Sequence, residues 1–235
     1  MKKLILIVVF VLSLSNLNAS NGIFIGADLG IPLNNQEFIK TSINGTMDTK
    51  SKNNLSLGLK LGYQHYFLNY IGIRGYVSGN YLNMDKETTI TQPGGIGNVV
   101  SKGNTKYNGY NIGANIDMLL KYDFNDIFAL GGFIGLGYEY SKFNDTNINI
   151  IADGSGAVGL AGKLKNINGN GLIYNIGIQA IFIQNHQIEL GVKLAPYNIK
   201  AESDLKKGLQ QEPNYHTKVQ SGTTIFLGYR YLFNV

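Results

Sequence analysis

The sequence contains no cysteine and no tryptophan, and it has only three histidines and four prolines. Without cysteine, the chain has no disulfide bonds and no thiolate metal ligands. The histidines, His65, His186 and His216, lie too far apart in the expected structure to form one site. Beyond residue 12, no apolar run approaches the roughly 20 residues that a membrane-spanning helix needs. We therefore expect neither a metal centre nor a cofactor, and no bundle of membrane helices.

The first 19 residues have the features of a secretory signal peptide. Lys2 and Lys3 precede an apolar run over residues 4–12, and a polar stretch then leads to the small residue Ala19. The apolar run is too short for a membrane anchor, which is the alternative interpretation. We expect cleavage after Ala19, which makes residues 1–19 a signal peptide and residues 20–235 a single domain.

The chain has a small excess of positive charge. Lysine and arginine number 20, against 15 aspartate and glutamate residues, for a formal net charge of +5. A surface that binds nucleic acid would concentrate its positive charges on one face. Here these residues are scattered along an exported chain, so we expect no nucleic-acid partner.

Eight segments of the mature chain alternate apolar side chains with small, polar or charged ones. In the second segment, for example, Leu59 and Leu61 stand on either side of Lys60. Successive side chains of a strand point to opposite faces, and in lipid only a closed barrel satisfies every backbone group of a sheet. The pattern therefore predicts an all-β fold, an eight-stranded antiparallel up-and-down transmembrane β-barrel, rather than a soluble sandwich or a lipocalin-like barrel. The segments are about residues 22–33, 55–66, 71–82, 110–122, 128–141, 172–183, 188–197 and 223–235.

The connections between these segments fall into two classes. Three are short turns and four are long, and in bacterial barrels short turns face the periplasm while long loops face outside. An even number of strands then places both termini in the periplasm. One long loop contains Gly154, Gly156 and Gly159 in a G-x-G-x-x-G spacing, but no helix follows, so we interpret it as a flexible external loop. The short turns are about 67–70, 125–126 and 184–187, and the long loops are about 34–54, 83–109, 142–171 and 198–222.

Aromatic residues gather near the two ends of the expected strands. Amphipathic rings prefer the headgroup level of a membrane, and a soluble sandwich has no reason to sort them into two bands. The pattern therefore supports the membrane barrel. The expected inner belt is Tyr63, Phe67, Tyr70, Tyr122, Phe124, Phe128, Phe182, Tyr231 and Phe233, and the expected outer belt is Tyr81, Tyr110, Tyr138, Tyr140 and Tyr174.

The inward positions of the expected strands carry charges of both signs. An eight-stranded barrel is just wide enough for its side chains to fill it, and unpaired charge there is costly. A gated ion path or a catalytic cluster is possible chemistry for such a network, but we favour mutual neutralisation that keeps the lumen filled. We expect ion pairs between Asp28 and Lys60 and between Glu189 and Arg230. The full network is Asp28, Asp117, Glu139 and Glu189 with Lys60, Arg74, Lys121, Lys193 and Arg230.

The last segment carries the clearest resemblance to a known family. With its alternating run over residues 224–233, the eight segments and the long loops, the mature chain resembles the small bacterial outer-membrane barrels of the opacity-protein and porin-like superfamily. The resemblance implies a place in the outer membrane of a Gram-negative bacterium, in contact with its lipid. It also implies that Tyr229, Tyr231 and Phe233 form the signal that the barrel-insertion machinery recognises. Unlike the family pattern, the chain ends on Asn234 and Val235 rather than on an aromatic residue.

The resemblance implies several functions that the barrel residues do not separate. The first is a structural or surface-interaction role, such as adhesion, in which external loops contact a host or surface ligand. The second is a narrow porin-like channel for small solutes. The third is an outer-membrane lipid-modifying enzyme, which we do not expect because His216 is followed by Thr217 and Lys218 without a serine two residues on.

Overall fold

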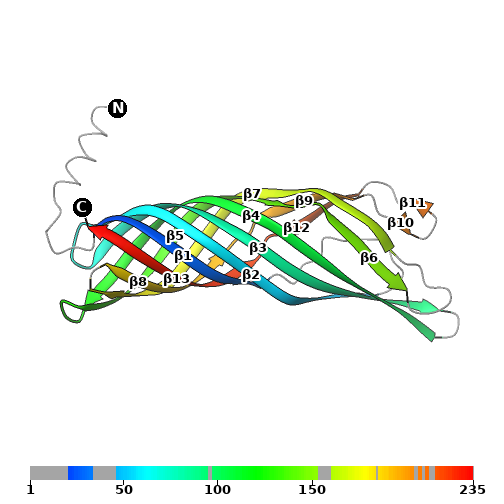
Figure 1. Ribbon diagram of the computed structural model, residues 1–235, viewed down its shortest axis with the longest axis horizontal. Helices are drawn as coiled ribbons and strands as arrows, with labels where there is room; N and C mark the ends of the chain where they lie inside the picture. Colours follow the sequence, from blue (N-terminus) through cyan, green and yellow to red (C-terminus); the bar gives the residue numbers. More distant parts are fainter. Residues whose placement is uncertain are drawn as a thin grey trace, which may run out of the picture.

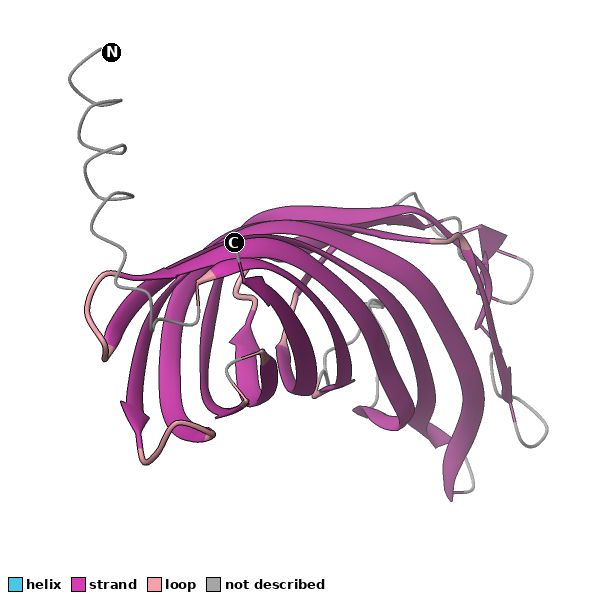
Figure 2. Ribbon diagram, turned by 60° about the vertical axis from the view of Figure 1, so that its left-hand side comes forward, coloured by secondary structure: helices cyan, strands magenta, loops and turns pink. Residues whose placement is uncertain are grey.

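The computed structural model describes residues 21–33, 46–94, 97–152, 160–183, 185–203, 206–207, 210–211 and 215–234. Nearly all of these described residues are in β-strands, as Figure 2 shows. Within it, no helix is long and apolar enough to cross a membrane. The expected signal peptide and the G-x-G-x-x-G segment lie outside the described residues, so cleavage after Ala19 stays a prediction.

Eight strands form a closed antiparallel ring, which confirms the predicted barrel (Figure 1). Each strand of the ring pairs with two neighbours, and the ring closes where β1 meets β13 and where β7 meets β8. Closure leaves no sheet edge exposed to lipid at this level. The eight strands, in ring order, are β1 (Gly22–Pro32), β2 (Thr46–Tyr66), β3 (Ile71–Gly94), β4 (Gly97–Asp123), β5 (Phe128–Phe143), β7 (Leu160–Phe182), β8 (His186–Leu194) and β13 (Thr223–Asn234).

The short turns all lie at one end of the barrel, together with the start of β1 and the end of β13 (Figure 1). This agrees with the expected arrangement of the termini. In the turn between β4 and β5, the Asn125 side chain accepts hydrogen bonds from the backbone N–H groups of Ile127 and Phe128. Such side-chain bonds satisfy turn amides that have no ladder partner.

There are four long connections, as expected, but their described residues are mostly strand rather than irregular loop. Residues 83–109 form the outer part of a hairpin in which β3 and β4 stay paired up to Gly94 and Gly97. Strands β2 and β7 also continue well past the expected boundaries. The segment rich in threonine around residues 88–91 suits a strand because β-branched side chains fit a pleated sheet. The remaining outer strands are β6 (Thr146–Ala152), β9 (Asn198–Ser203), β10 (Lys206–Lys207), β11 (Gln210–Gln211) and β12 (Tyr215–Gln220).

Burial alternates along each barrel strand as the sequence predicts. On β1, Phe24 is fully buried while Ile25 is 51% exposed, and the pattern continues along the strand. Leu59 and Leu61 of β2 face outward on either side of buried Lys60. The outward face is therefore apolar and the inward face carries the charges.

Both aromatic belts lie on the outward face. At the inner end, ring centroids are 5.0 Å apart for Tyr122 and Phe124 and 5.2 Å apart for Phe128 and Phe182. At the outer end the expected tyrosines are exposed, and they come from β3, β4, β5 and β7. The region of the barrel between the two belts is therefore the part that crosses the membrane.

Beyond the outer belt, the strands enclose an apolar core of their own. Leu164 and Ile167 of β7 are fully buried there, and they pack with residues of β3, β4, β6 and β9. We call this part of the molecule the outer extension. Its core consists of Leu82, Met84, Ile90, Tyr107, Phe143, Ile148, Leu164, Ile167, Ile173, Ala195, Tyr197, Ile199 and Ala201.

Candidate functional site

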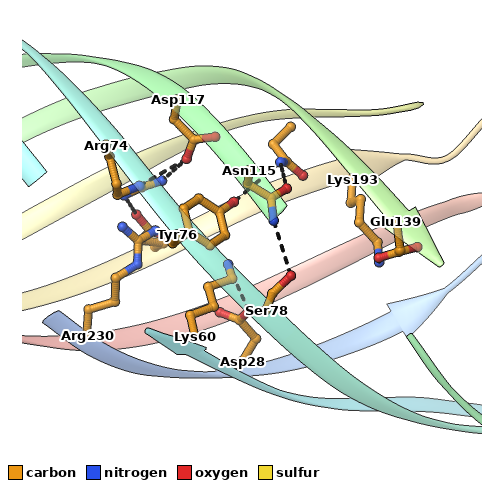
Figure 3. Close-up of polar contacts among 12 residues, drawn as sticks. Asp28, Lys60, Arg74, Tyr76, Ser78, Asn115, Asp117, Glu139, Lys193 and Arg230 are labelled. Carbon is orange, nitrogen blue, oxygen red and sulfur yellow. Dashed lines mark hydrogen bonds and ion pairs between the residues drawn. The ribbon is translucent and has the colours of Figure 1, made fainter. Parts of the chain in front are cut away.

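The centre of the lumen holds two arginines and two carboxylates. Arg74 and Asp117 are paired directly across β3 and β4. The Arg74 Nε lies 3.0 Å from Asp117 Oδ2, and Arg74 Nη1 donates to Glu189 Oε1 at 2.7 Å. Glu189 also contacts the guanidinium of Arg230, as expected from the sequence. All four side chains are fully buried, and their charges cancel. Figure 3 shows Arg74, Asp117 and Arg230 in this group.

Aromatic rings fill the space beside these arginines. The Arg74 guanidinium carbon lies 4.9 Å from the centroid of Phe133, and that of Arg230 lies 5.1 Å from the centroid of Phe24. Tyr76 lies beside both arginines. A cation over a ring face gains electrostatic attraction while the ring excludes water. Each arginine therefore has both a carboxylate and a ring against it.

The second expected ion pair lies further toward the outer end. The Lys60 ammonium is 2.8 Å from Asp28 Oδ2, and both side chains are less than a tenth exposed. Lys60 also lies over Phe226, 4.4 Å from the ring centroid. The register explains the pair, because Asp28 is opposite Gly58 and Lys60 is opposite Gly26, so two glycines leave room for two charged side chains.

A third group of interacting side chains lies at the outer end of the lumen. The sequence predicted two of its members, Glu139 and Lys193, but not Ser141 and Tyr197. Lys193 donates to Glu139 at 2.6 Å, and Tyr197 Oη donates to the other oxygen of Glu139 at 2.8 Å. Ser141 Oγ is 2.5 Å from Tyr197 Oη. Burial, and next the Glu139 carboxylate, raise the pKa of the Tyr197 phenol, so the phenol stays protonated as a donor. Ser141 could have been found from its position two residues after Glu139 on the same strand face.

The inner mouth of the lumen holds an ion pair that was not predicted from the sequence. Lys121 Nζ lies 2.9 Å from Asp123 Oδ1, and the ammonium is 5.1 Å from the centroid of Tyr66. Asp123 lies beyond the expected strand end at residue 122, although its spacing from Lys121 places both on one face. With Asp123 included, the ion pairs of the membrane-level lumen are balanced in charge.

Glycines on the inward face make room for this network. A Cβ at Gly135 would overlap the carboxylate of Asp117, and one at Gly228 would overlap that of Asp28. The cavities that remain are small. One of about 30 Å³ lies beside Lys60 and Lys193, and one of about 20 Å³ lies beside Lys193 and Glu139. A single water needs roughly 10–15 Å³ measured in this way, so each cavity holds about one or two waters.

The residues expected to form the insertion signal lie on the outward face of β13. Tyr229 and Phe233 are about half exposed, and the rings of Tyr231 and Phe233 are 4.9 Å apart. His186, the first residue of β8, joins this group through a 2.7 Å hydrogen bond between its Nδ1 and Tyr229 Oη. In the part of the chain with described placement, no group of three or more metal-ligating side chains could hold an ion.

The comparisons with known proteins agree with this architecture. The family model of the Helicobacter outer membrane protein family matches residues 58–233, which is most of the chain. The chain belongs to this family. The protein is therefore an outer-membrane β-barrel, as the resemblance in the sequence implied.

Several solved structures of outer membrane proteins are similar to this chain at low sequence identity. The outer membrane protein OprG from Pseudomonas aeruginosa has a TM-score of 0.51 and 16% identity, with 94% of this chain and all of OprG covered. The attachment invasion locus protein Ail of Yersinia pestis is 18% identical, covering 91% of this chain and 97% of Ail with a TM-score of 0.31. AlkL is 14% identical, with 94% of each chain covered and a TM-score of 0.46. No curated protein matches the sequence. The likeness to OprG supports the fold alone.

Proposed function

We propose that this outer-membrane protein has a closed lumen and acts through its outer extension, which contacts partners at the cell surface. The observation that carries the proposal is the filling of the lumen, where two cavities lined by described residues have volumes of only about 30 and 20 Å³. A solute would have to displace Arg74 or Arg230 together with the rings that pack on them. Separating a buried ion pair costs several kcal/mol, so thermal opening is rare.

The outer extension has the properties of a stable contact surface. Its apolar core holds the strands together above the membrane, whereas isolated loops would need a partner to become ordered. Its outward side chains are polar, including Lys102, Asn104 and Lys106 on β4. A polar surface on a rigid support suits reversible recognition because little chain entropy is lost on binding.

Conductance of the refolded mature barrel in planar bilayers tests the closed lumen. We expect no steady current steps from the wild-type protein. Asp28→Asn and Arg230→Ala serve as controls, because each removes one partner of a lumen ion pair. Steady steps in the wild type whose size changes in either variant would overturn the proposal.

Adhesion of expressing bacteria tests the contact surface. The variant shortens the β3–β4 hairpin by joining the strands near Asp85 and Lys106, which are paired across the hairpin. We expect lower binding to host cells or to extracellular matrix, with the barrel still folded. Unchanged binding together with unchanged surface exposure would count against the outer extension as the contact region.

One observation favours a narrow channel as a second candidate function. Lys193 lines both small cavities and Glu139 lines the smaller one, and among the described lumen cations only Lys193 has no aromatic ring stacked on it. Separating Lys193 from Glu139 would therefore join the two cavities, and it would break fewer contacts than separating any of the other described lumen ion pairs. Glu139→Gln should raise the frequency of brief openings if the lumen forms a channel.

A further inference from the structure

The lipid-facing side of the barrel has a groove that ends below two lysines. The groove has a volume of about 750 Å³ and crosses β3, β4, β5, β7 and β8. Its surface is almost entirely apolar. The outward side chains that line its outer half are Ile116, Ile134, Leu136, Tyr174, Ile176 and Leu194.

Three tyrosines lie at the outer end of this groove, at the expected headgroup level. Tyr174 lines the groove itself, and Tyr138 and Tyr140 follow on the same face of β5. The Tyr138 hydroxyl donates to Asn170 Oδ1 at 2.8 Å, which fixes the ring against β7. An acyl chain in the groove would therefore emerge among rings that prefer the interface.

Two lysines stand immediately above the tyrosines. Lys142 is the next outward residue of β5 after Tyr140, and Lys200 lies on β9. The register places them at one level, since Asn168 of β7 is paired with Lys142 on one side and with Lys200 on the other. Neighbouring strands are about 4.8 Å apart, so the two lysine backbones are separated by roughly 10 Å.

Lys142 and Lys200 form no ion pair with a described residue of the protein. Both side chains are exposed, and no described carboxylate lies within ion-pair distance of either. The nearest outward carboxylate on β9, that of Glu202, accepts a hydrogen bond from Asn166 at 2.8 Å. Long lysine side chains bend toward a membrane interface and place their ammonium groups at the phosphate level.

The other side of the barrel lacks this combination. The outward positions at the outer ends of β1 and β13 are Ile31, Leu33 and Ile225, with no described lysine, arginine or tyrosine among them. The tyrosines and the free lysines thus occur together, and they occur above the groove.

We propose that this lysine-topped groove binds one outer-leaflet lipid that carries a phosphate headgroup. The acyl chain lies along the groove, the tyrosines contact the glycerol or sugar region, and Lys142 and Lys200 bind the phosphate. Each lysine near an anionic surface favours binding, so two together give a preference on the order of tenfold over a zwitterionic lipid. The inference does not depend on a surface partner.

Fluorescence quenching in vesicles tests the site because the natural chain contains no tryptophan. Leu172→Trp places a groove reporter beside Tyr138 without entering the groove lining, and Ile31→Trp places a matched distant reporter at the outer end of β1. Each mature protein is refolded in phosphatidylcholine that contains a minority of phosphatidic acid, with bromine on the acyl chains of one lipid or the other. Tyr174→Trp is the alternative groove reporter if Leu172→Trp fails to fold.

We expect brominated phosphatidic acid to quench the groove reporter about tenfold more than its mole fraction in the vesicle predicts. It should quench the distant reporter in proportion to that mole fraction. Adding Lys142→Gln and Lys200→Gln should bring the ratio at the groove reporter down to that at the distant one. Lys102→Gln, which changes an exposed lysine further out on β4, should leave it unchanged. Equal quenching of the groove reporter by the two lipids, an equal preference at both reporters, or a preference that survives the double glutamine variant would overturn the proposal.

Discussion

The membrane-level barrel and the outer extension place opposite kinds of side chain inside and outside. In the barrel, Leu59 is 66% exposed while Arg74 is fully buried. In the outer extension, Leu164 is fully buried while Lys102 and Asn104 are exposed. The strands are continuous between the two regions, so the reversal does not reflect a change of fold. It reflects a change of solvent from lipid to water, because the face that meets the solvent must match it.

The reversal takes place within single strands. On β4, the outward residues change from Ile112 and Tyr110 to Asn108 and Lys106. On the inward face, Asp117 and Asn111 give way to Tyr107. The hydrogen-bond ladder with β3 is unbroken through the change. The outer tyrosines therefore mark a boundary between solvents rather than the end of a strand.

Removing one arginine from the barrel should have the largest effect on stability. Arg230→Ala leaves Glu189 with one partner fewer in a fully buried place, and breaking such a pair costs about 3–5 kcal/mol. We expect a lower unfolding temperature in detergent micelles, measured by the heat-dependent shift in gel mobility. Arg230→Lys keeps the charge and should lower the temperature less. Equal unfolding temperatures for both variants and the wild type would contradict the structural role of the pair.

Truncating the core of the outer extension should weaken that region while the barrel stays folded. Leu164→Ala removes a fully buried side chain, and such cavities cost about 2–5 kcal/mol. We expect protease cleavage within the extension at concentrations that leave the wild type intact. The gel-mobility transition of the barrel should stay within a few degrees of its wild-type value, and a large fall in that temperature would show that the two regions unfold as one.

Adding a charge to the outward face should cost free energy in only one of the two regions. Ile116→Lys puts an ammonium on the lipid face of β4, where a charge near the bilayer midplane costs about 2–4 kcal/mol. Asn104→Lys makes a similar change on the same face of the same strand in the outer extension, where surface substitutions usually stay within about 0.5 kcal/mol. Urea titration of both variants in lipid vesicles measures the difference. Similar losses of stability would mean that the proposed boundary is misplaced.

The reversal explains which parts of the fold could be predicted from the sequence. In the barrel strands, apolar outward residues alternate with inward polar ones, so the sequence located each strand and assigned its two faces. The same assignment predicted the ion pairs Asp28–Lys60 and Glu189–Arg230. The outer strands keep the alternation but exchange the polarity of the faces. Their mixture of threonine, lysine and asparagine therefore resembled loops, and residues 83–109 were wrongly expected to be one.

The candidate site was predictable where strand register alone decides proximity. Asp28 and Lys60 are diagonal neighbours on paired strands, so counting along the chain was enough. The bond from Arg74 to Glu189 joins β3 to β8 across the lumen, and β3 and β8 are not paired. Tyr197, which follows β8, also bonds to Glu139 of β5, and β5 and β8 are not paired with each other. Contacts across the lumen depend on barrel curvature and side-chain reach, which a pattern of alternation does not contain.

Tyr197 connects the two regions, and replacing it should have the smallest effect of the four. Its ring packs in the core of the outer extension, while its hydroxyl donates to Glu139 at 2.8 Å. Tyr197→Phe keeps the ring and removes the donor, which costs about 1.5–3 kcal/mol for a bond to a charged group. Because Lys193 still holds Glu139, we expect a value at the low end of this range in the micelle unfolding assay. Ser141→Ala is the matched control, since it removes the other partner of the phenol and leaves Glu139 bound. A loss in Tyr197→Phe no greater than in Ser141→Ala would mean that the Glu139 bond does not couple the outer extension to the charged lumen.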